Sequence, residues 1–133
     1  MVVSCIDTNV YIHAMQGICS AQNIFIESDI VYVPMIVLGE LEYGFRNGSK
    51  YKRNKLQLNK FLGGPNINVV HTSLEVVEHY GRIKSKLKKQ GTPIPENDVW
   101  IAACASSLGS NLVSFDQHFK PIKSLDFKLL DLK

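Results

Sequence analysis

Short apolar runs alternate along the chain with longer stretches in which apolar residues recur every three or four positions. The short runs are rich in β-branched residues and predict buried strands, whereas the longer stretches predict amphipathic helices. The predicted strands are residues 2–6, 30–33, 67–71 and 112–115, with a candidate fifth at 127–130. The predicted helices are residues 8–15, 20–27, 34–47, 50–62, 72–90 and 98–108.

Capping and turn residues set the predicted helix ends. Ser20 is a suitable N-cap for the second helix, and Pro34 suits the first turn of the third. Residues 72–75, Thr-Ser-Leu-Glu, have the form of a capping box that opens the fifth helix. Asp98 opens the last predicted helix, either as its cap or beside a capping Asn97.

Strands separated by helices are typical of an α/β protein with a mostly parallel sheet. No internal repeat, linker or low-complexity segment divides the chain. We therefore expect a single domain over residues 1–133, with a parallel sheet of about four or five strands and helices on both faces.

Four acidic residues stand against apolar segments, where ionised side chains are rare unless a cation accompanies them. Asp7 ends the first predicted strand, and Asp116 directly follows the fourth. Asp98 precedes the run Val-Trp-Ile-Ala-Ala, and Glu40 interrupts an apolar helix. No lysine or arginine lies beside any of the four in sequence. A divalent metal ion accounts for all four together.

The fold class is expected to bring these acids together. Ligand sites of parallel α/β sheets lie beyond the carboxyl ends of the strands, and Asp7 and Asp116 occupy such positions. If the first and fourth strands are neighbours, the two carboxylates meet at one edge. Clustered carboxylates hold Mg²⁺ or Mn²⁺, which lowers the pKa of a bound water and offsets charge on a reacting phosphate. The predicted metal and catalytic residues are Asp7, Glu40, Asp98 and Asp116.

Each acid also has a structural interpretation. Asp7, Asp98 and Asp116 are residues of a type that caps helices or forms turns. Glu40 is harder to explain in this way, because its neighbours three and four positions away on the helix are largely apolar. One shared metal ion explains all four acids together, whereas the structural interpretation needs a separate reason for each.

Other polar residues need no catalytic explanation. Glu42 can form an ion pair with Arg46 one helical turn later and is expected at the surface. His118 lies two residues after Asp116, where a surface or capping role is the simpler interpretation. No histidine has the spacing or the cysteine partner that a zinc site requires.

Composition narrows the class of protein. The 133 residues are 45% hydrophobic and 20% charged, which is ordinary for a globular domain. No apolar run is long enough to span a membrane, and no basic segment precedes the first apolar run, so neither a membrane protein nor a secreted protein is expected. Of the three cysteines, Cys5 and Cys104 lie in apolar runs, which favours buried free thiols and a cytoplasmic location.

The charge balance is mildly basic. A formal net charge of +3 and a pI of about 8.8 are compatible with nucleic-acid binding but do not require it. Within the basic segment 50–55, we expect Lys50, Lys52 and Arg53 to contact phosphates, and Tyr51 is a candidate for stacking on a base. The alternative is a solvated helix face on which Tyr51 serves ordinary packing.

The motifs around the four acids, in this order, resemble those of the PIN domain, and within it those of the VapC-type toxin ribonucleases. The resemblance covers essentially the whole chain and is carried by IDTN at 6–9, VLGELEYG at 37–44, NDVWIAA at 97–103 and SFDQHF at 114–119. Thr8, Asn9 and Ser114 match polar positions near the family's site and are expected to contact substrate. Ser114 stands where many relatives have threonine, which keeps the hydroxyl.

The resemblance implies a three-layer α/β/α fold and a metal-dependent endoribonuclease whose metal ligands, for Mg²⁺ or Mn²⁺, are the four acids. It also implies an RNA substrate, often a tRNA loop, a cognate antitoxin protein and a homodimer. No acidic position of the family pattern is missing from this chain.

Other families with an aspartate after the first strand fit less well. A phosphatase of the haloacid dehalogenase type needs a second aspartate at the position of Asn9, and a response-regulator receiver needs one after the third strand, which ends in residues 71–73, His-Thr-Ser. Two alternatives stay open. A non-catalytic PIN-type module would bind RNA in EDTA without cleaving it, and a DNA nuclease would use a related metal site.

Overall fold

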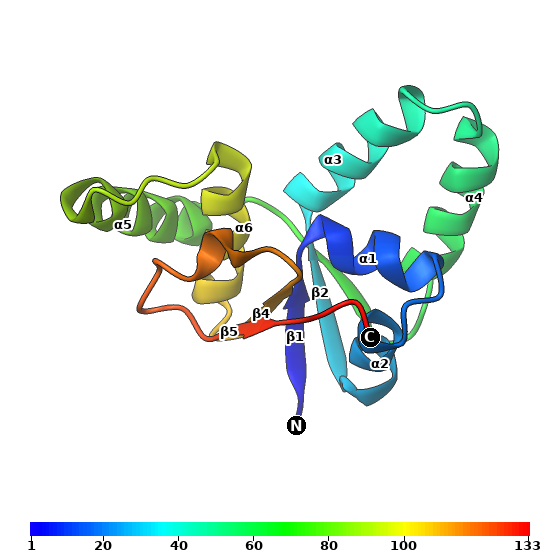
Figure 1. The fold of residues 1–133 in the computed structure, drawn as a ribbon, viewed down its shortest axis with the longest axis horizontal. Helices are drawn as coiled ribbons and strands as arrows, with labels where there is room; N and C mark the ends of the chain where they lie inside the picture. The colour runs from blue at the N-terminus through cyan, green and yellow to red at the C-terminus, as the bar shows by residue number, and fades with distance from the viewer.

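The computed structural model describes all residues 1–133 and shows a central sheet flanked by helices (Figure 1). The strands are β1 (Val3–Ile6), β2 (Ile30–Pro34), β3 (Ile67–Val70), β4 (Asn111–Ser114) and β5 (Phe127–Leu129). The helices are α1 (Thr8–Met15), α2 (Cys19–Glu27), α3 (Met35–Arg46), α4 (Tyr51–Leu62), α5 (Leu74–Gln90), α6 (Glu96–Ser107) and the 3₁₀ helix η1 (Gln117–Phe119).

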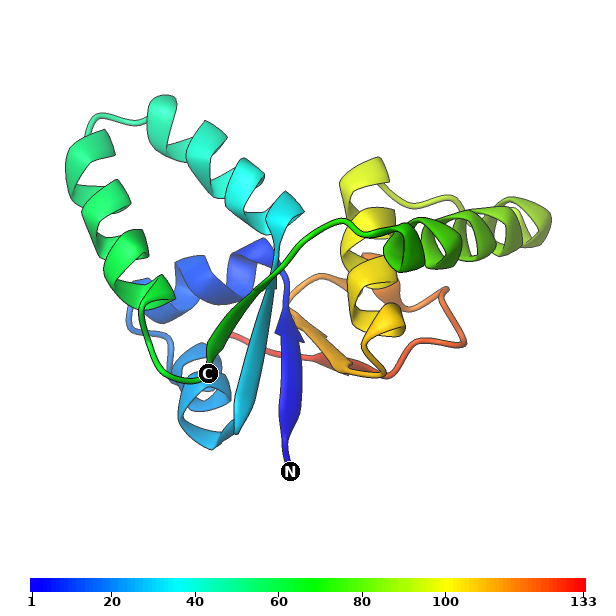
Figure 2. The ribbon, with the colours of Figure 1, turned by 180° about the vertical axis from the view of Figure 1, so that it is seen from behind.

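The sheet is parallel throughout and has the strand order β3-β2-β1-β4-β5. The chain therefore builds outward from β1 to β3 and then returns to add β4 on the other side of β1. Helices α1 to α4 lie on one side of the sheet, and α5 and α6 lie on the other (Figures 1 and 2). This arrangement confirms the predicted three-layer α/β/α class, including the candidate fifth strand.

Because helices cover both faces of the sheet, side chains on both faces of its central strands are buried, and these strands are therefore continuous apolar runs in the sequence. The core contains 25 buried apolar residues, among them the last two residues of β1 and half of α6. Cys5 and Cys104 are buried free thiols, as the sequence predicted. None of the helices combines the length and the apolar character that crossing a bilayer requires.

Two predicted helix starts were wrong. Ser20 is not an N-cap: α2 begins at Cys19 after Ile18, and the Ser20 hydroxyl donates to the carbonyl of Asp131 at 2.5 Å. Pro34 is the last residue of β2 and the N-cap of α3, so it precedes the first turn instead of lying in it.

The starts of α5 and α6 also differ from the prediction. Ser73 caps α5 by accepting a hydrogen bond from the backbone N–H of Val76 at 3.3 Å, so residues 72–75 do not form a capping box. Helix α6 begins at Glu96, directly after the extended backbone of Pro95, whose ψ is 144°. Asp98 therefore lies inside the first turn, and neither it nor Asn97 caps the helix.

Candidate metal centre

Asp7 lies at the carboxyl end of β1 and is the N-cap of α1. Its carboxylate accepts hydrogen bonds from the Thr8 backbone N–H at 2.8 Å and from the Ser114 hydroxyl at 2.7 Å. Only 6% of the residue is exposed. Burial raises the pKa of Asp7 to about 6; the two hydrogen bonds oppose this rise, and the charges of Asp98 and Glu40 add to it.

The pairing of β1 with β4 brings the next acid beside Asp7. Ile6 lies opposite Val113, and the Asp7 backbone N–H donates to the Val113 carbonyl at 3.0 Å. The Ser114 hydroxyl is fully buried and receives a hydrogen bond from the Asp116 backbone N–H at 2.9 Å. One hydroxyl thus joins the two acids, and the expected adjacency of the first and fourth strands is confirmed.

Asn9 fastens α1 to the segment after β4. Its side-chain oxygen accepts from the Phe115 backbone N–H at 3.2 Å, and its side-chain nitrogen donates to the Ser114 hydroxyl at 3.3 Å. These contacts fix the geometry of the loop that carries Asp116.

Glu40 reaches the same edge of the sheet from the middle of α3. One carboxylate oxygen accepts from the Thr8 hydroxyl at 2.5 Å, and the other accepts from the Asn97 amide at 3.4 Å. Its helical surroundings are more open than expected, because Tyr43 is 71% exposed. A cavity of about 580 Å³ opens here, lined by Met35, Ile36, Gly39, Glu40, Tyr43 and Asn97.

Asp98 and Asp116 meet across the imidazole of His118. The Nδ1 atom of His118 lies 3.0 Å from Oδ2 of Asp98 and 3.1 Å from Oδ2 of Asp116. His118 is exposed at the surface, as expected from the sequence, but its ring also belongs to the acidic cluster, which the sequence did not predict. The only sequence signal was its spacing two residues after Asp116.

The cluster has a large excess of negative charge. No lysine or arginine forms an ion pair with Asp7, Glu40, Asp98 or Asp116. Burial raises the pKa of Asp98; the contact with His118 opposes this rise, and the charges of Asp116 and Glu40 add to it. Carboxylate oxygens that no lysine or arginine neutralises are the donors that Mg²⁺ and Mn²⁺ prefer, so the donor set fits a divalent ion.

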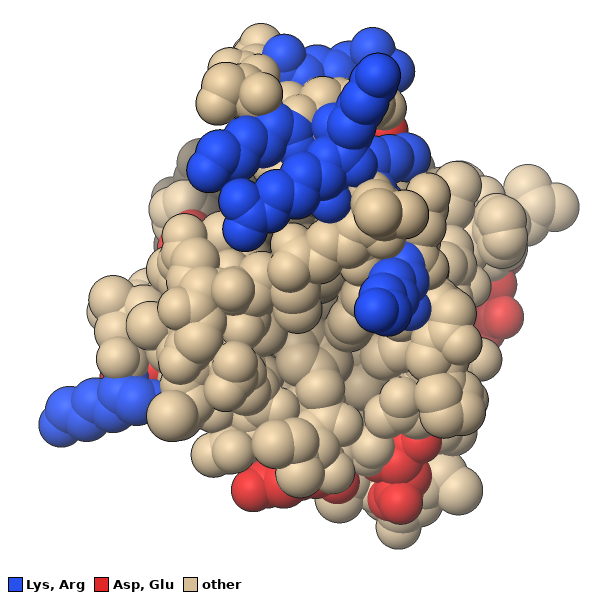
Figure 3. Space-filling view, turned by 90° about the vertical axis from the view of Figure 1, so that its right-hand side faces the viewer, with Lys and Arg blue, Asp and Glu red and all other residues tan.

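The basic residues expected to bind substrate lie elsewhere, at the start of α4. Lys50, Lys52 and Arg53 are exposed and form no ion pair, and blue side chains gather at one end of the face in Figure 3. Lys50 and Arg53 line a cavity of about 330 Å³ between α1, α3 and α4.

Two other side chains in this segment form hydrogen bonds with α3. Lys55 and Tyr51 donate to the Glu42 carboxylate at 2.6 and 2.5 Å. The predicted pair of Glu42 with Arg46 is also present, at 2.8 Å. Hydrogen bonds from Lys55 and Tyr51 are the main reason that the pKa of Glu42 falls to about 2. Tyr51 thus helps to hold α4 on α3.

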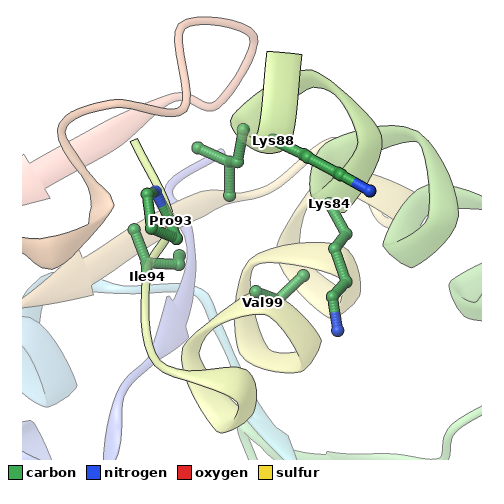
Figure 4. A pocket seen from close by; sticks show the side chains of 6 residues that line it. Lys84, Lys88, Pro93, Ile94 and Val99 are labelled. Carbon is green, nitrogen blue, oxygen red and sulfur yellow. The ribbon is translucent and has the colours of Figure 1, made fainter. Parts of the chain in front are cut away.

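A separate apolar cavity of about 300 Å³ lies between α5, the loop after it and α6 (Figure 4). Its lining offers no carboxylate, and of its two lysines Lys84 is paired with Glu96 at 2.7 Å. This cavity has none of the donors that the acidic cluster provides.

Comparison with known proteins agrees with the fold and the motifs. The PIN domain family model matches residues 4–125. Ribonuclease VapC1 of Haemophilus influenzae is 29% identical over 128 residues, covering 92% of this chain and 94% of its own, and ribonuclease VapC2 of Rickettsia felis is 26% identical over 125 residues, covering 90% and 92%.

Solved structures give the same result. VapBC2 of Rickettsia felis bound to a promoter DNA fragment superposes with a TM-score of 0.87 at 26% identity, covering 98% of this chain and 100% of that chain. VapBC-1 of nontypeable Haemophilus influenzae has a TM-score of 0.83 at 26% identity, covering 96% and 98%. The family match, the strand order and the ordered motifs agree: the chain belongs to the PIN domain family, as a member of the VapC type.

Proposed function

We propose that this protein is a metal-dependent endoribonuclease in which Asp7, Glu40, Asp98 and Asp116 hold Mg²⁺ or Mn²⁺. The observation that carries the proposal is that donor atoms of Asp98, Asp116 and His118 lie within 4.8 Å of one another, beside Asp7, whose pKa the charges of Asp98 and Glu40 raise. No lysine or arginine pairs with any of the four acids at this edge of the sheet, where β1 and β4 end. In parallel α/β sheets this place, where the strand order reverses, is where ligands bind. The relatives that match most of the chain carry the name ribonuclease.

When bound, the ion supplies a water of lowered pKa and stabilises charge on the scissile phosphate. The chain's own residues hold the ligands in place. Ser114 is buried and donates to Asp7, and Thr8 donates to Glu40, so we assign both to positioning the carboxylates. Asn9 positions the loop before Asp116. Hydrolysis by this route leaves a 5′-phosphate and a 3′-hydroxyl, and no side chain acts as nucleophile.

The proposal includes partners. Lys50, Lys52 and Arg53, exposed and free of ion pairs, are proposed to contact RNA phosphates beyond the cleavage site. The VapBC structures are of toxin–antitoxin systems, which supports a cognate antitoxin for this chain, and a homodimer follows from the family likeness. We place the enzyme in the cytoplasm, where RNA substrates such as tRNA are present and free thiols stay reduced.

The test is cleavage of end-labelled total tRNA by the purified protein in Mg²⁺ or Mn²⁺. EDTA and Asp7→Asn serve as controls, with Asp126→Asn as a matched variant of an exposed aspartate. Discrete fragments that disappear in EDTA and in Asp7→Asn, but not in Asp126→Asn, support the proposal. RNA binding that survives EDTA without cleavage would instead indicate a non-catalytic RNA-binding module. Cleavage of DNA in preference to RNA would indicate a DNA nuclease.

A further inference from the structure

Building on the proposed function, we infer that His118 is itself a ligand of the metal, so that the centre offers one nitrogen donor among its carboxylates. The inference begins with position. A single atom, His118 Nδ1, faces two different carboxylates, and the three donor atoms of Asp98, Asp116 and His118 all lie within 4.8 Å of one another.

The separations suit shared coordination. Two ligand atoms at right angles around an ion, each about 2.1 Å from it, lie about 3.0 Å apart. The Nδ1 atom lies 3.0 Å from Asp98 and 3.1 Å from Asp116; these are hydrogen-bond distances, and they also match the separation of two neighbouring ligands of one ion. The three donor atoms lie within 4.8 Å of one another, close enough to bind one ion together.

The backbone around His118 holds the imidazole in this orientation. Oδ1 of Asp116 accepts from the His118 backbone N–H at 3.0 Å, which leaves Oδ2 to face the ring. Phe119, the next residue, is fully buried and packs against Phe127 with ring centroids 5.6 Å apart. The histidine is therefore carried on a short, anchored turn and not on a free loop.

A nitrogen ligand changes which metal the site prefers. Both Mg²⁺ and Mn²⁺ favour oxygen donors, but Mn²⁺ is a first-row transition ion and accepts an imidazole nitrogen more readily than Mg²⁺ does. We therefore expect the protein to prefer Mn²⁺ over Mg²⁺ by more than an all-carboxylate site does. His118→Ala should weaken Mn²⁺ binding by about tenfold and change Mg²⁺ binding by less than about threefold.

Pulsed electron paramagnetic resonance of the Mn²⁺-loaded protein tests the coordination directly. The wild-type spectrum should show the hyperfine coupling of a directly bound nitrogen. That coupling should be lost in both His118→Ala and His118→Asn, since asparagine retains an N–H that can bond to the carboxylates but lacks the imidazole nitrogen. His71→Ala, at an exposed histidine after β3, should retain it.

The outcomes separate this inference from the proposed function. Tight Mn²⁺ binding without nitrogen coupling in the wild type overturns the role of His118 and leaves the carboxylate centre standing. Coupling that persists in His118→Ala also overturns it. Failure of the wild type to bind Mn²⁺ overturns both. Unchanged thermal unfolding of the two His118 variants without metal confirms that they are folded.

Discussion

At the scale of single residues, Asp7 carries the clearest conflict between folding and function. The residue is nearly buried and its pKa is raised to about 6, so without metal the fold bears the cost of an ionised carboxylate. The native state binds more protons than the unfolded state between about pH 4 and pH 6. The free energy of unfolding of the metal-free protein should therefore fall as pH rises through this window, by about 3 kcal/mol from this residue.

Asp7→Asn should remove this contribution. At pH 7 in EDTA the variant should be more stable than the wild type by about 1–2 kcal/mol, because the lost carboxylate hydrogen bond offsets part of the gain. Urea unfolding at several pH values between 4 and 7 provides the measurement. A variant that is less stable than the wild type at pH 7 would contradict burial of the carboxylate as the origin of its raised pKa.

The residue scale also shows where sequence reasoning stops. The four acids could be found because each interrupts an apolar pattern. His118 could not, because its role depends on the direction of a side chain on a turn whose orientation is set by the burial of Phe119. Asn97 was likewise expected to serve a helix cap, yet its amide faces Glu40 from another helix.

At the scale of elements, α1, α2 and α4 meet through aromatic contacts on one side of the sheet. Tyr11 and Phe25 both pack edge-on against Phe61, with centroids 5.0 and 5.1 Å apart. The Tyr11 hydroxyl is buried and has no hydrogen-bond partner. A buried polar group without a partner is destabilising, so this hydroxyl works against an otherwise apolar contact.

Tyr11→Phe should therefore leave the fold intact and raise the free energy of unfolding by about 1 kcal/mol. Tyr51→Phe is the matched control, since it removes a hydroxyl that donates to Glu42 and should lower stability instead. Chemical denaturation of both variants under one set of conditions decides the point. Loss of stability in Tyr11→Phe would show that its hydroxyl has a partner in solution.

The start of α4 makes a separate prediction about RNA. Lys52→Ala with Arg53→Ala should weaken binding across RNA sequences and reduce the slope of log affinity against log salt by about 1–2, because two phosphate contacts are lost. Filter binding at several salt concentrations, in EDTA to prevent cleavage, gives the slope. Lys123→Ala with Lys128→Ala removes the same charge from exposed positions at the other edge of the sheet. If both double variants weakened RNA binding equally, the basic segment would contribute only through the net charge of the protein.

Helix boundaries show why elements are easier to predict than their ends. The strands and helices follow from periodicity, which the core enforces along their whole length. Ser20 has the chemistry of an N-cap, but its hydroxyl serves the C-terminal segment through the carbonyl of Asp131. The two residues of that contact lie near opposite ends of the sequence, so no local pattern predicts it.

At the scale of the whole molecule, the strand order brings the residues of the site together. Adding β4 beside β1, after β2 and β3 have extended the other edge, places Asp7 and Asp116 at one point of the sheet. Helices from both layers then contribute Glu40 and Asp98. The alternation of strands and helices predicted the class of fold, but the strand order, which decides that these residues meet, became certain only with the structure.

The sharpest test of the proposed catalytic metal centre is a Mn²⁺ titration in which ion occupancy and RNA cleavage are followed on the same sample. Cleavage should rise in proportion to occupancy and should stop in EDTA. In Asp98→Asn, both curves should move together to higher Mn²⁺ concentration. Cleavage that persists in EDTA, or an Asp98→Asn protein that binds and cleaves like the wild type, would contradict the assignment of the acidic cluster as the catalytic metal centre.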